Sequence, residues 1–450
     1  MDVKVSVILP SLNVAEYIEE CLNSVVSQTL RELEIICVDA GSVDGTYEIC
    51  SGFSKEDTRI KLIKSDKKSY GYQVNLGLDF AGGEYVAILE TDDYIDYVMY
   101  ETLYMQAVRY DLDYIAADFD SFYTLQSGER LFKRNCLFNE NRSWYSQVLE
   151  SEQIDLLRLS DYVLWKGIYK KQFLKDNNVR LHESNGAAFQ DMGFLQQVKT
   201  YARRAMYLDL SYYRYRRDRL EASTNNLNGL IYYYNEFMWL NNELKLTVKM
   251  NEFQKQNYYT TLGWAFLGKY DEILIKLDYD YQNEKLEIPY HWFKTTLCTA
   301  IDNKILIRSP QNEWYWEELM LLLESQESHA ELILNRNKNC EDLKQELLCK
   351  VKDKKVIIWG CGMRGERLMF FCDNNHICID SFCDNNVSFH GGKKFGFPII
   401  SPDDIEKKLS DKNMIVLLSM KEEIGQVRRQ LISMGIECDR IIDLIPDGVI

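Results

Sequence analysis

An apolar run that ends in a cluster of carboxylates is the feature that most limits how this chain can fold. Residues 85–96 read YVAILETDDYID, in which Val86–Leu89 are followed by Glu90, Asp92 and Asp93. A short apolar run bounded by polar residues is typical of a strand buried on both faces of a parallel sheet. Ligands of open α/β sheets bind at the carboxyl ends of strands. Because close carboxylates repel one another, the pattern favours a bound Mg²⁺ or Mn²⁺ that carries substrate phosphates.

The residues before this run alternate between strand and helix patterns. We expect strands at 3–9, 34–38, 60–63 and 84–89, with helices at 16–27, 71–80 and after the turn at 41–45. This alternation predicts a doubly wound, mostly parallel sheet with right-handed crossovers. Alone, the ETDD segment would more often be a solvated acidic turn, and Asp39 would more often be a turn former. In such a sheet, however, both lie at strand ends that face one crevice.

Composition narrows the functional class. The 450-residue chain carries a net charge of −16, which argues against a general nucleic-acid binder. It has no run of uncharged apolar residues long enough for a membrane helix, and its first residues read directly into a strand without a signal-peptide pattern. None of the 12 cysteines forms a C-x-x-C pair, which favours buried free thiols in a reducing cytosol over a zinc site.

Changes in pattern predict three domains. Residues 1–225 have the α/β pattern, 226–350 read as a helical region, and 351–450 read as a smaller Rossmann-like α/β domain. Within the first domain we expect a helix at 97–110, a strand at 114–117 and irregular structure at 121–141. The helical region is rich in aromatic residues, which we expect to form a core rather than a groove; they include Tyr232, Tyr233, Tyr234, Phe237 and Trp239.

The C-terminal domain carries a glycine pattern between a strand and a helix. Gly360, Gly362 and Gly365 form G-x-G-x-x-G after the strand at 355–359, and Asp384 lies 24 residues after Gly360. This context fits binding of a phosphate at a helix N-terminus and of a ribose by the aspartate. A nucleotide-binding role stays open, but no Tyr-x-x-x-Lys pair follows that would favour a dehydrogenase. The domain is similar to small Rossmann-like domains appended to bacterial polysaccharide-biosynthesis enzymes.

Five segments in order resemble glycosyltransferase family 2, whose inverting members have the GT-A fold. They read VSVILPSLNVAEYIEECLNSVVSQTL, IICVDAGSVDGT, NLGLDFAGGEYVAILETDDYID, LWKGIYKKQFL, and AAFQDMGF followed by SYYRYRRDRLEAST. The resemblance covers about the first 220 residues. It implies a nucleotide-diphosphate sugar as donor, with UDP favoured, and Mn²⁺ or Mg²⁺ as cofactor.

The resemblance also implies roles for individual residues. Contacts to the donor would come from Pro10, Ser11, Leu12, Asp39, Gln73, Glu90, Asp92 and Asp93. Among these, Pro10, Ser11 and Leu12 would line the base pocket. Asp39 would accept from the nucleobase, Glu90 would lie near the ribose and Asp93 would lie beside the donor sugar. Asp92 would bind the metal ion that bridges the diphosphate. Asp191 would be the general base that deprotonates the acceptor hydroxyl.

Several positions depart from the commonest family pattern. Ala40, Glu90 and Gln190 replace carboxylates that the family usually has as aspartate, aspartate and glutamate, and the GYQVN segment lacks an arginine near the diphosphate. A subset of the family resembles this chain at these points, so we interpret the departures as a subtype. Candidates for the missing arginine are Gln73 and the cluster Arg214, Arg216 and Arg217. Trp165 would be an acceptor wall or a core residue beside a solvated Lys166.

These observations favour an inverting, metal-dependent glycosyltransferase that builds bacterial surface polysaccharide on a glycan or lipid-linked acceptor. A lipid-linked acceptor would bring a cytoplasmic enzyme to the inner face of the membrane. The alternative is a non-catalytic nucleotide-sugar-binding scaffold, against which the intact carboxylate set argues. A nucleotidyltransferase or reductase is a third reading, and the first strand lacks the glycine-rich, lysine-containing signature that a nucleotidyltransferase would show. The sequence does not predict the donor sugar or the oligomeric state.

Overall fold

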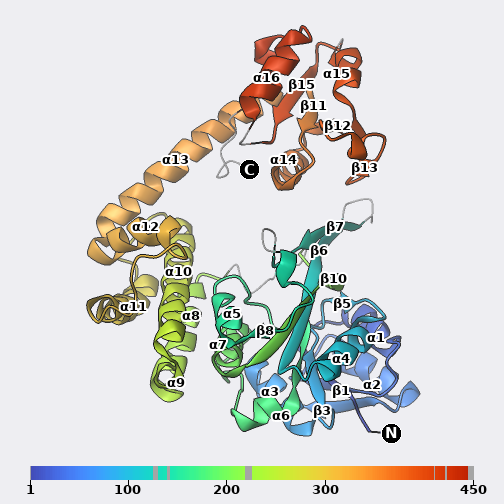
Figure 1. Ribbon diagram of the computed structural model, residues 1–450, viewed down its shortest axis with the longest axis vertical. Coiled ribbons are helices and arrows are strands. Elements are labelled where there is room, and N and C mark those ends of the chain that lie inside the picture. The colour runs from blue at the N-terminus through green and yellow to red at the C-terminus, as the bar shows by residue number, and fades with distance from the viewer. Residues whose placement is uncertain are drawn as a thin grey trace. The chain divides into compact units, whose positions relative to one another are not determined.

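The computed structural model describes residues 2–124, 130–138, 142–217, 226–409, 411–420 and 423–443. They form two compact units, Met1–Ala330 and Glu331–Ile450. The first unit contains a large sheet with its helices and then a group of helices, and the second contains a smaller sheet (Figure 1). The predicted class, an α/β sheet followed by a helical region and a second α/β sheet, is confirmed.

The large sheet has a parallel half and a mixed half. Its described strands are β1 (Val5–Ser11), β2 (Leu33–Asp39), β3 (Ile60–Lys64), β4 (Tyr85–Ile88), β5 (Tyr94–Ile95), β6 (Tyr114–Thr124), β7 (Arg130–Asn135), β8 (Leu149–Glu150), β9 (Gly167–Lys170) and β10 (Arg204–Arg216). Their order is β3-β2-β1-β4-β9-β6-β10-β5, with β7 on β6 and β8 on β10. Strands β1 to β4 pair in parallel, whereas β9 is antiparallel to β4 and β6. The carboxyl ends of β1, β2 and β4 therefore meet at one edge.

Helices connect and cover these strands. They are α1 (Ile18–Val26), α2 (Thr46–Glu56), α3 (Tyr70–Phe80), α4 (Met99–Arg109), α5 (Ser151–Leu156), α6 (Lys171–Asp176) and α7 (Gln190–Tyr201). Helix α1 buries the apolar stripe Ile18, Cys21, Leu22 and Val25, as its spacing predicts. Helix α3 begins at Ser69, whose hydroxyl caps it by accepting from Tyr72 N. In α7 nearly every residue is buried, so this helix is held from several sides.

The prediction of irregular structure at 121–141 is wrong for residues 121–124 and 130–135, which form strands, and holds for 136–138. Strand β6 continues to Thr124, and β7 returns antiparallel to it, with Phe122 opposite Phe132. Residues 125–129 and 139–141 of that prediction lie outside the described residues. Phe122 is buried, and the guanidinium of Arg130 lies over its ring. The strand pattern was hidden because charged and aromatic residues alternate here without a clear apolar face.

The pairing of β10 with β6 is interrupted before it reaches the edge of the sheet. The register shifts between Leu208 and Ser211 and again between Ser211 and Tyr213. Such bulges bend a strand and change the direction of the side chains that follow. Residues 213–216 beyond the irregularity end near the turn after β4, where Tyr213 pairs with Ile95.

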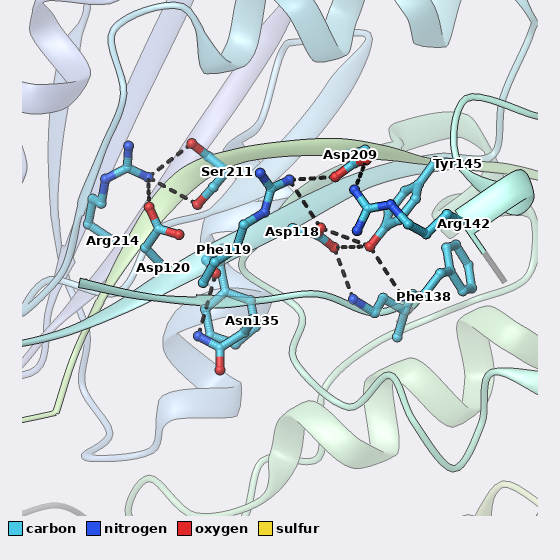
Figure 2. Close-up of polar contacts among 12 residues, drawn as sticks. Asp118, Phe119, Asp120, Asn135, Phe138, Arg142, Tyr145, Asp209, Ser211 and Arg214 are labelled. Atoms are coloured by element: carbon cyan, nitrogen blue, oxygen red, sulfur yellow. Dashed lines mark hydrogen bonds and ion pairs between the residues drawn. The ribbon is translucent and has the colours of Figure 1, made fainter. Parts of the chain in front are cut away.

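A polar network lies at this irregularity (Figure 2). Asp118, which is buried, accepts from Tyr145 Oη at 2.8 Å and from Leu137 N at 3.0 Å. Arg134 bridges Asp118 at 3.3 Å and Asp209 at 2.7 Å. Asp209 belongs to the stretch of β10 that the register shift leaves out of the pairing with β6, so these ion pairs hold the bulged residues in place.

The helical region follows the large sheet. Its helices are α8 (Gly229–Met238), the π-helical turn η3 (Trp239–Glu243), α9 (Leu246–Lys249), α10 (Glu252–Lys276), α11 (Glu284–Asp302), α12 (Glu313–Glu324) and α13 (Gln326–Val351). Figure 1 shows α5 and α7 between the sheet and helices α8 and α10, which they contact. Of the aromatic residues predicted to form a core, Phe237 is buried, whereas Tyr232, Tyr233, Tyr234 and Trp239 are half-buried.

The second unit has a smaller, mostly parallel sheet. Its strands are β11 (Lys355–Trp359), β12 (Cys378–Cys383), β13 (Lys393–Lys394), β14 (Phe397–Ile400), β15 (Met414–Leu418) and β16 (Ile441–Ile442), in the order β13-β14-β12-β11-β15-β16. Its helices after α13 are α14 (Met363–Asn374), α15 (Pro402–Leu409) and α16 (Ile424–Ser433). This agrees with the predicted Rossmann-like order of strand, glycine loop and helix. Among the described residues, no helix is long and apolar enough to cross a membrane.

Candidate active site

A cavity of about 560 Å³ opens at the edge where the parallel strands end. Its walls come from the end of β1, the start of α3, the turn after β4, the loop before α7 and the end of β10. It is lined by Pro10, Ser11, Leu12, Val14, Lys68, Tyr70, Gln73, Glu90, Thr91, Asp92, Tyr123, Trp165, Gly186, Ala187, Ala188, Phe189, Gln190, Asp191, Tyr215, Arg216 and Arg217. The structure thus brings most predicted site residues together. Asp39 and Asp93 are buried and lie outside this lining.

The carboxylates of the turn after β4 differ in what surrounds them. Glu90 and Asp92 line the cavity, and Glu90 Oε1 accepts from Tyr70 Oη at 2.5 Å. Asp93 accepts from Tyr213 Oη at 2.8 Å and from Arg216 N at 2.7 Å. Burial raises the pKa of Asp93 well above its usual range, and the charge of Asp92 raises it further. Asp93 therefore joins the turn to β10, a role that the prediction of a donor-sugar contact did not include.

The turn offers ligands that suit a divalent cation. Asp92 is half-buried and shares the cavity wall with Glu90, and both provide carboxylate oxygens, which Mg²⁺ and Mn²⁺ prefer. The charge of Asp92 already perturbs its neighbour Asp93, so a cation here would relieve repulsion within the turn. Mg²⁺ is commonly held by one or two carboxylates together with substrate phosphates. The residues present therefore fit the predicted metal.

The predicted base pocket is built by contacts within the chain. Asp39 accepts from Gly41 N at 2.9 Å, Ser42 N at 3.1 Å and Ser42 Oγ at 2.5 Å, so it shapes the loop after β2. Gln73 Nε2 donates to Ser11 O at 2.9 Å and to Val38 O at 2.7 Å. Because both amide hydrogens of Gln73 are used in this way, the amide cannot also donate to a diphosphate. The expectation that Gln73 takes the place of the missing arginine at the diphosphate is therefore corrected: Gln73 holds the ends of β1 and β2.

Asp191 stands at the start of α7 and lines the cavity. Its Oδ1 accepts from Met192 N at 2.9 Å. Burial raises the pKa of Asp191 to about 7; the bond from Met192 N opposes this rise, and the negative charge of Glu236 adds to it. A carboxylate whose pKa lies near neutral pH is suited to accept a proton as a general base.

The loop before α7 is fixed by side chains that sequence reasoning did not assign. Gln190 Oε1 accepts from Ala188 N at 2.7 Å, and its Nε2 donates to Ser184 Oγ at 2.9 Å and Gly186 O at 3.3 Å. A glutamate, which the family usually has here, could accept but could not donate. Tyr70 N donates to Gly186 O at 2.9 Å, so the same residue that binds Glu90 also joins this loop to α3. No local sequence signal points to Tyr70, because its partners are distant in the chain.

The arginines at the end of β10 have different surroundings. Arg216 donates through Nε to Asp92 O at 2.9 Å and pairs with Glu20 at 2.9 Å, so it braces the acidic turn. Arg214 pairs with Asp120 at 3.2 Å and does not line the cavity. Arg217 is exposed and lines the cavity, with its guanidinium over the ring of Tyr215. Among the three arginines of this cluster, Arg217 is best placed for a phosphate.

Aromatic residues form part of the cavity wall. The Trp165 ring stacks on Tyr213 with a centroid distance of 4.1 Å and on Tyr215 at 5.1 Å. Trp165 is 5% exposed but still lines the cavity. It is therefore both a core residue and part of the cavity wall. Lys166 is buried and pairs with Asp161 at 2.7 Å, which corrects the expectation of a solvated lysine.

The glycine loop of the second unit is held by its own chain. Asp384 Oδ2 accepts from Cys361 N at 2.8 Å and its Oδ1 accepts from Asn386 N at 2.9 Å. Lys394 donates to Cys361 O and pairs with Glu366 at 2.9 Å. The aspartate expected to bind a ribose thus bonds to the backbone of the loop.

The fold and the cavity together define a class. The mixed α/β sheet, with Glu90, Asp92 and Asp191 lining the cavity at its strand ends, has the fold class of the GT-A glycosyltransferases. Residues 6–176 match the family described as glycosyl transferase family 2, and residues 352–442 match the family described as C2185-like, N-terminal. The match over residues 6–176 confirms the resemblance to glycosyltransferase family 2 that was read from the N-terminal sequence.

Curated relatives support this assignment over about half of the chain. Glycosyltransferase GlyA of Streptococcus pneumoniae is 30% identical over 224 residues, which cover 48% of this chain and 31% of GlyA. Glycosyltransferase GlyG of the same organism is 29% identical over 217 residues, which cover 47% of this chain and 70% of GlyG. The match therefore spans less than a third of the length of GlyA.

A solved structure shows the same fold. The crystal structure of S. aureus TarS 1–349 in complex with UDP-GlcNAc aligns with a TM-score of 0.54 at 19% identity, covering 73% of this chain and 88% of that chain. At this identity the likeness concerns the fold. It agrees with the mixed sheet described above and with the predicted GT-A fold.

Proposed function

We propose that the N-terminal domain transfers a sugar from a nucleotide-diphosphate sugar, with UDP as the favoured nucleotide, to a hydroxyl of a glycan or lipid-linked acceptor with inversion. The observation that carries the proposal is that one cavity contains both the acidic turn of Glu90 and Asp92 and the aspartate of raised pKa, Asp191. The first set suits a metal-bound diphosphate, and Asp191 suits a general base. TarS, which shares the fold, was crystallised with UDP-GlcNAc.

The chemistry follows from these positions. Asp191 accepts the proton of the acceptor hydroxyl as its oxygen bonds to the anomeric carbon. The bond from that carbon to the diphosphate oxygen breaks, and the electron pair leaves with the nucleoside diphosphate. Asp92, with Glu90 nearby, would hold the Mg²⁺ or Mn²⁺, which when bound neutralises the leaving group. Arg217 would add a contact to the diphosphate from the end of β10.

The proposed setting is bacterial surface polysaccharide assembly on the cytoplasmic side, with contact to the membrane surface where the acceptor is lipid-linked. The sequence of the second unit supports this setting through its similarity to domains appended to polysaccharide-biosynthesis enzymes.

The test is release of UDP from a panel of UDP-glucose, UDP-galactose and UDP-GlcNAc with Mn²⁺ and mixed glycan acceptors. We expect Asp92→Ala to lower kcat/KM by about 100-fold or more, because the metal loses its principal ligand. Asp191→Asn should lower kcat by about 10²- to 10⁴-fold, the usual contribution of a general base. Glu252→Gln, which changes an exposed residue of α10, serves as the control. Full transfer activity in both site variants would refute the assignment.

A further inference from the structure

A buried carboxylate from the helical region lies against the helix that carries Asp191. Glu236 of α8 is 2% exposed, and its Oε2 accepts from His182 Nδ1 at 3.0 Å. Its other oxygen, Oε1, is buried without a hydrogen-bond partner among the described residues. An unsatisfied buried carboxylate oxygen costs free energy, so its position calls for an explanation.

Glycine at position 193 of α7 makes room for this carboxylate. A β-carbon on Gly193 would collide with Glu236 Oε1, and its three nearest neighbours are all atoms of the Glu236 side chain. A glycine inside a helix is less favourable than alanine by about 1 kcal/mol. Gly193 lies two residues after Asp191. The first turn of α7 is therefore less stable than it would be with alanine, and the Glu236 carboxylate occupies the space that a β-carbon would fill.

His182 is itself fixed from two directions. Its ring stacks on Trp239 at 4.8 Å with an interplanar angle of 5°. Trp239 begins the π-helical turn η3, and such turns are frequent at functional sites. The backbone oxygen of His182 lies against Gly71 of α3, where a β-carbon would collide with it. The pair therefore connects the helical region to the loop that leads to Asp191.

We propose that Glu236, held by His182 and seated against Gly193, is a positioning residue for the general base Asp191, so that helix α8 takes part in the reaction. This inference rests on the proposed function, in which Asp191 is the base. It gives the helical region, for which sequence analysis predicted no function, a part in catalysis.

The charges around Asp191 agree with this role. The groups that face Asp191 electrostatically are Glu236 and Tyr233 of α8, Tyr70 of α3 and Tyr169 of β9. Those that face Glu236 are His182, Asp191 and Tyr258 of α10. Burial raises the pKa of Glu236, and the bond from His182 counteracts this. Because the tyrosines are neutral near pH 7, Glu236 is the nearby group that can raise the proton affinity of Asp191 through charge.

The experiment follows the titration of Asp191 in the full-length chain by ¹³C NMR with ¹³Cγ-labelled aspartate. The Asp191 signal is identified by its loss in Asp191→Asn. Glu236→Gln removes the charge but keeps the shape, and we expect the titration midpoint to fall by about half a pH unit or more. Gly193→Ala keeps the charge but displaces the carboxylate, and we expect the midpoint to fall as well. Glu252→Gln should leave the midpoint unchanged.

Two outcomes separate this inference from the proposed function. An unchanged midpoint in Glu236→Gln and Gly193→Ala, together with loss of UDP release in Asp191→Asn, overturns the positioning role and leaves the function standing. Retained UDP release in Asp191→Asn overturns the role of Asp191 as the general base, on which this inference rests, whatever the titration shows. If Glu236→Gln or Gly193→Ala does not fold, Glu236→Asp decides, because it withdraws the carboxylate from Gly193 by one methylene without adding volume, and the midpoint should then fall as well.

Discussion

At the scale of single residues, the raised pKa of Asp191 suits a general base but lowers the stability of the fold at neutral pH. Asp191 is half-buried at the start of α7, and desolvation of its carboxyl raises its pKa to about 7. In the unfolded chain an aspartate binds a proton only below about pH 4. The folded chain thus retains a proton that the unfolded chain has lost, between about pH 4 and pH 7. The stability of the fold therefore decreases as the pH rises through this window.

This predicts that Asp191→Asn, which should abolish most of the activity, raises the stability of the fold above pH 7. Above pH 7 the variant avoids the burial of an ionised carboxylate, so its Tm should exceed that of the wild type by a few degrees at pH 8. At pH 4 the difference should disappear, because Asp191 is then protonated in the folded wild type. Differential scanning fluorimetry at both pH values measures this. A lower Tm for the variant at pH 8 would contradict the account of Asp191.

The same pKa predicts the pH dependence of transfer. A general base must be ionised to accept a proton, so kcat/KM should fall about tenfold for each pH unit below pH 7 and level off above it. UDP release measured between pH 5 and pH 9 tests this. A flat profile across pH 6 to pH 8 would exclude Asp191 as the group that limits the rate.

Gln190 gives a prediction about the subtype. Its amide donates to Ser184 Oγ and Gly186 O and accepts from Ala188 N. Gln190→Glu restores the residue usual in the family but removes both donors, and we expect a loss of about 1–3 kcal/mol of unfolding free energy in urea. Stability equal to the wild type would mean that the loop does not depend on the amide.

At the scale of elements, strand β10 links the sheet to the cavity. The register shift near Ser211 is held by the network of Asp118, Arg134 and Asp209 (Figure 2). Asp118→Ala would leave the buried Tyr145 hydroxyl and Leu137 N–H without their acceptor, at a cost of about 2–4 kcal/mol. Asp209→Ala breaks more exposed ion pairs and should cost about 1 kcal/mol or less. Urea unfolding of both variants measures the contrast, and equal effects would contradict it.

The elements also show what sequence reasoning can reach. Strands β1, β2 and β4 were predicted because they are continuous apolar runs, and their parallel order follows from the intervening helices. The hairpin of β6 and β7 was missed because its mixed residues gain their strand partners only through tertiary pairing.

Some residues of the cavity could likewise be predicted from sequence, and others could not. Glu90, Asp92 and Asp191 were predicted from their positions and from the family, and they line one cavity. The inward position of Asp93 could not be predicted, because its partner Tyr213 is 120 residues away in the chain. The bonds of Gln73 to two strand ends were hidden for the same reason.

At the scale of the whole molecule, both α/β sheets carry a sequence pattern of nucleotide binding. The hydrogen bonds of the candidate residues distinguish the two patterns. In the second unit Asp384 bonds to Cys361 N and Asn386 N. We therefore expect Asp384→Ala to leave the increase in Tm caused by UDP and Mn²⁺ unchanged, measured against the variant without nucleotide. Loss of that increase in Asp384→Ala, with its retention in Asp92→Ala, would move the UDP site to the second unit.

The central claim is that the acidic turn after β4 binds a metal-nucleoside diphosphate in the cavity that also contains Asp191. Isothermal titration of UDP into the wild type, Asp92→Ala and Asp191→Asn, each with Mn²⁺ and with EDTA, tests it most directly. We predict UDP binding that requires Mn²⁺ in the wild type, persists in Asp191→Asn and weakens by about tenfold or more in Asp92→Ala. UDP binding that is the same with Mn²⁺ and with EDTA, and that is unaffected by Asp92→Ala, would contradict the account.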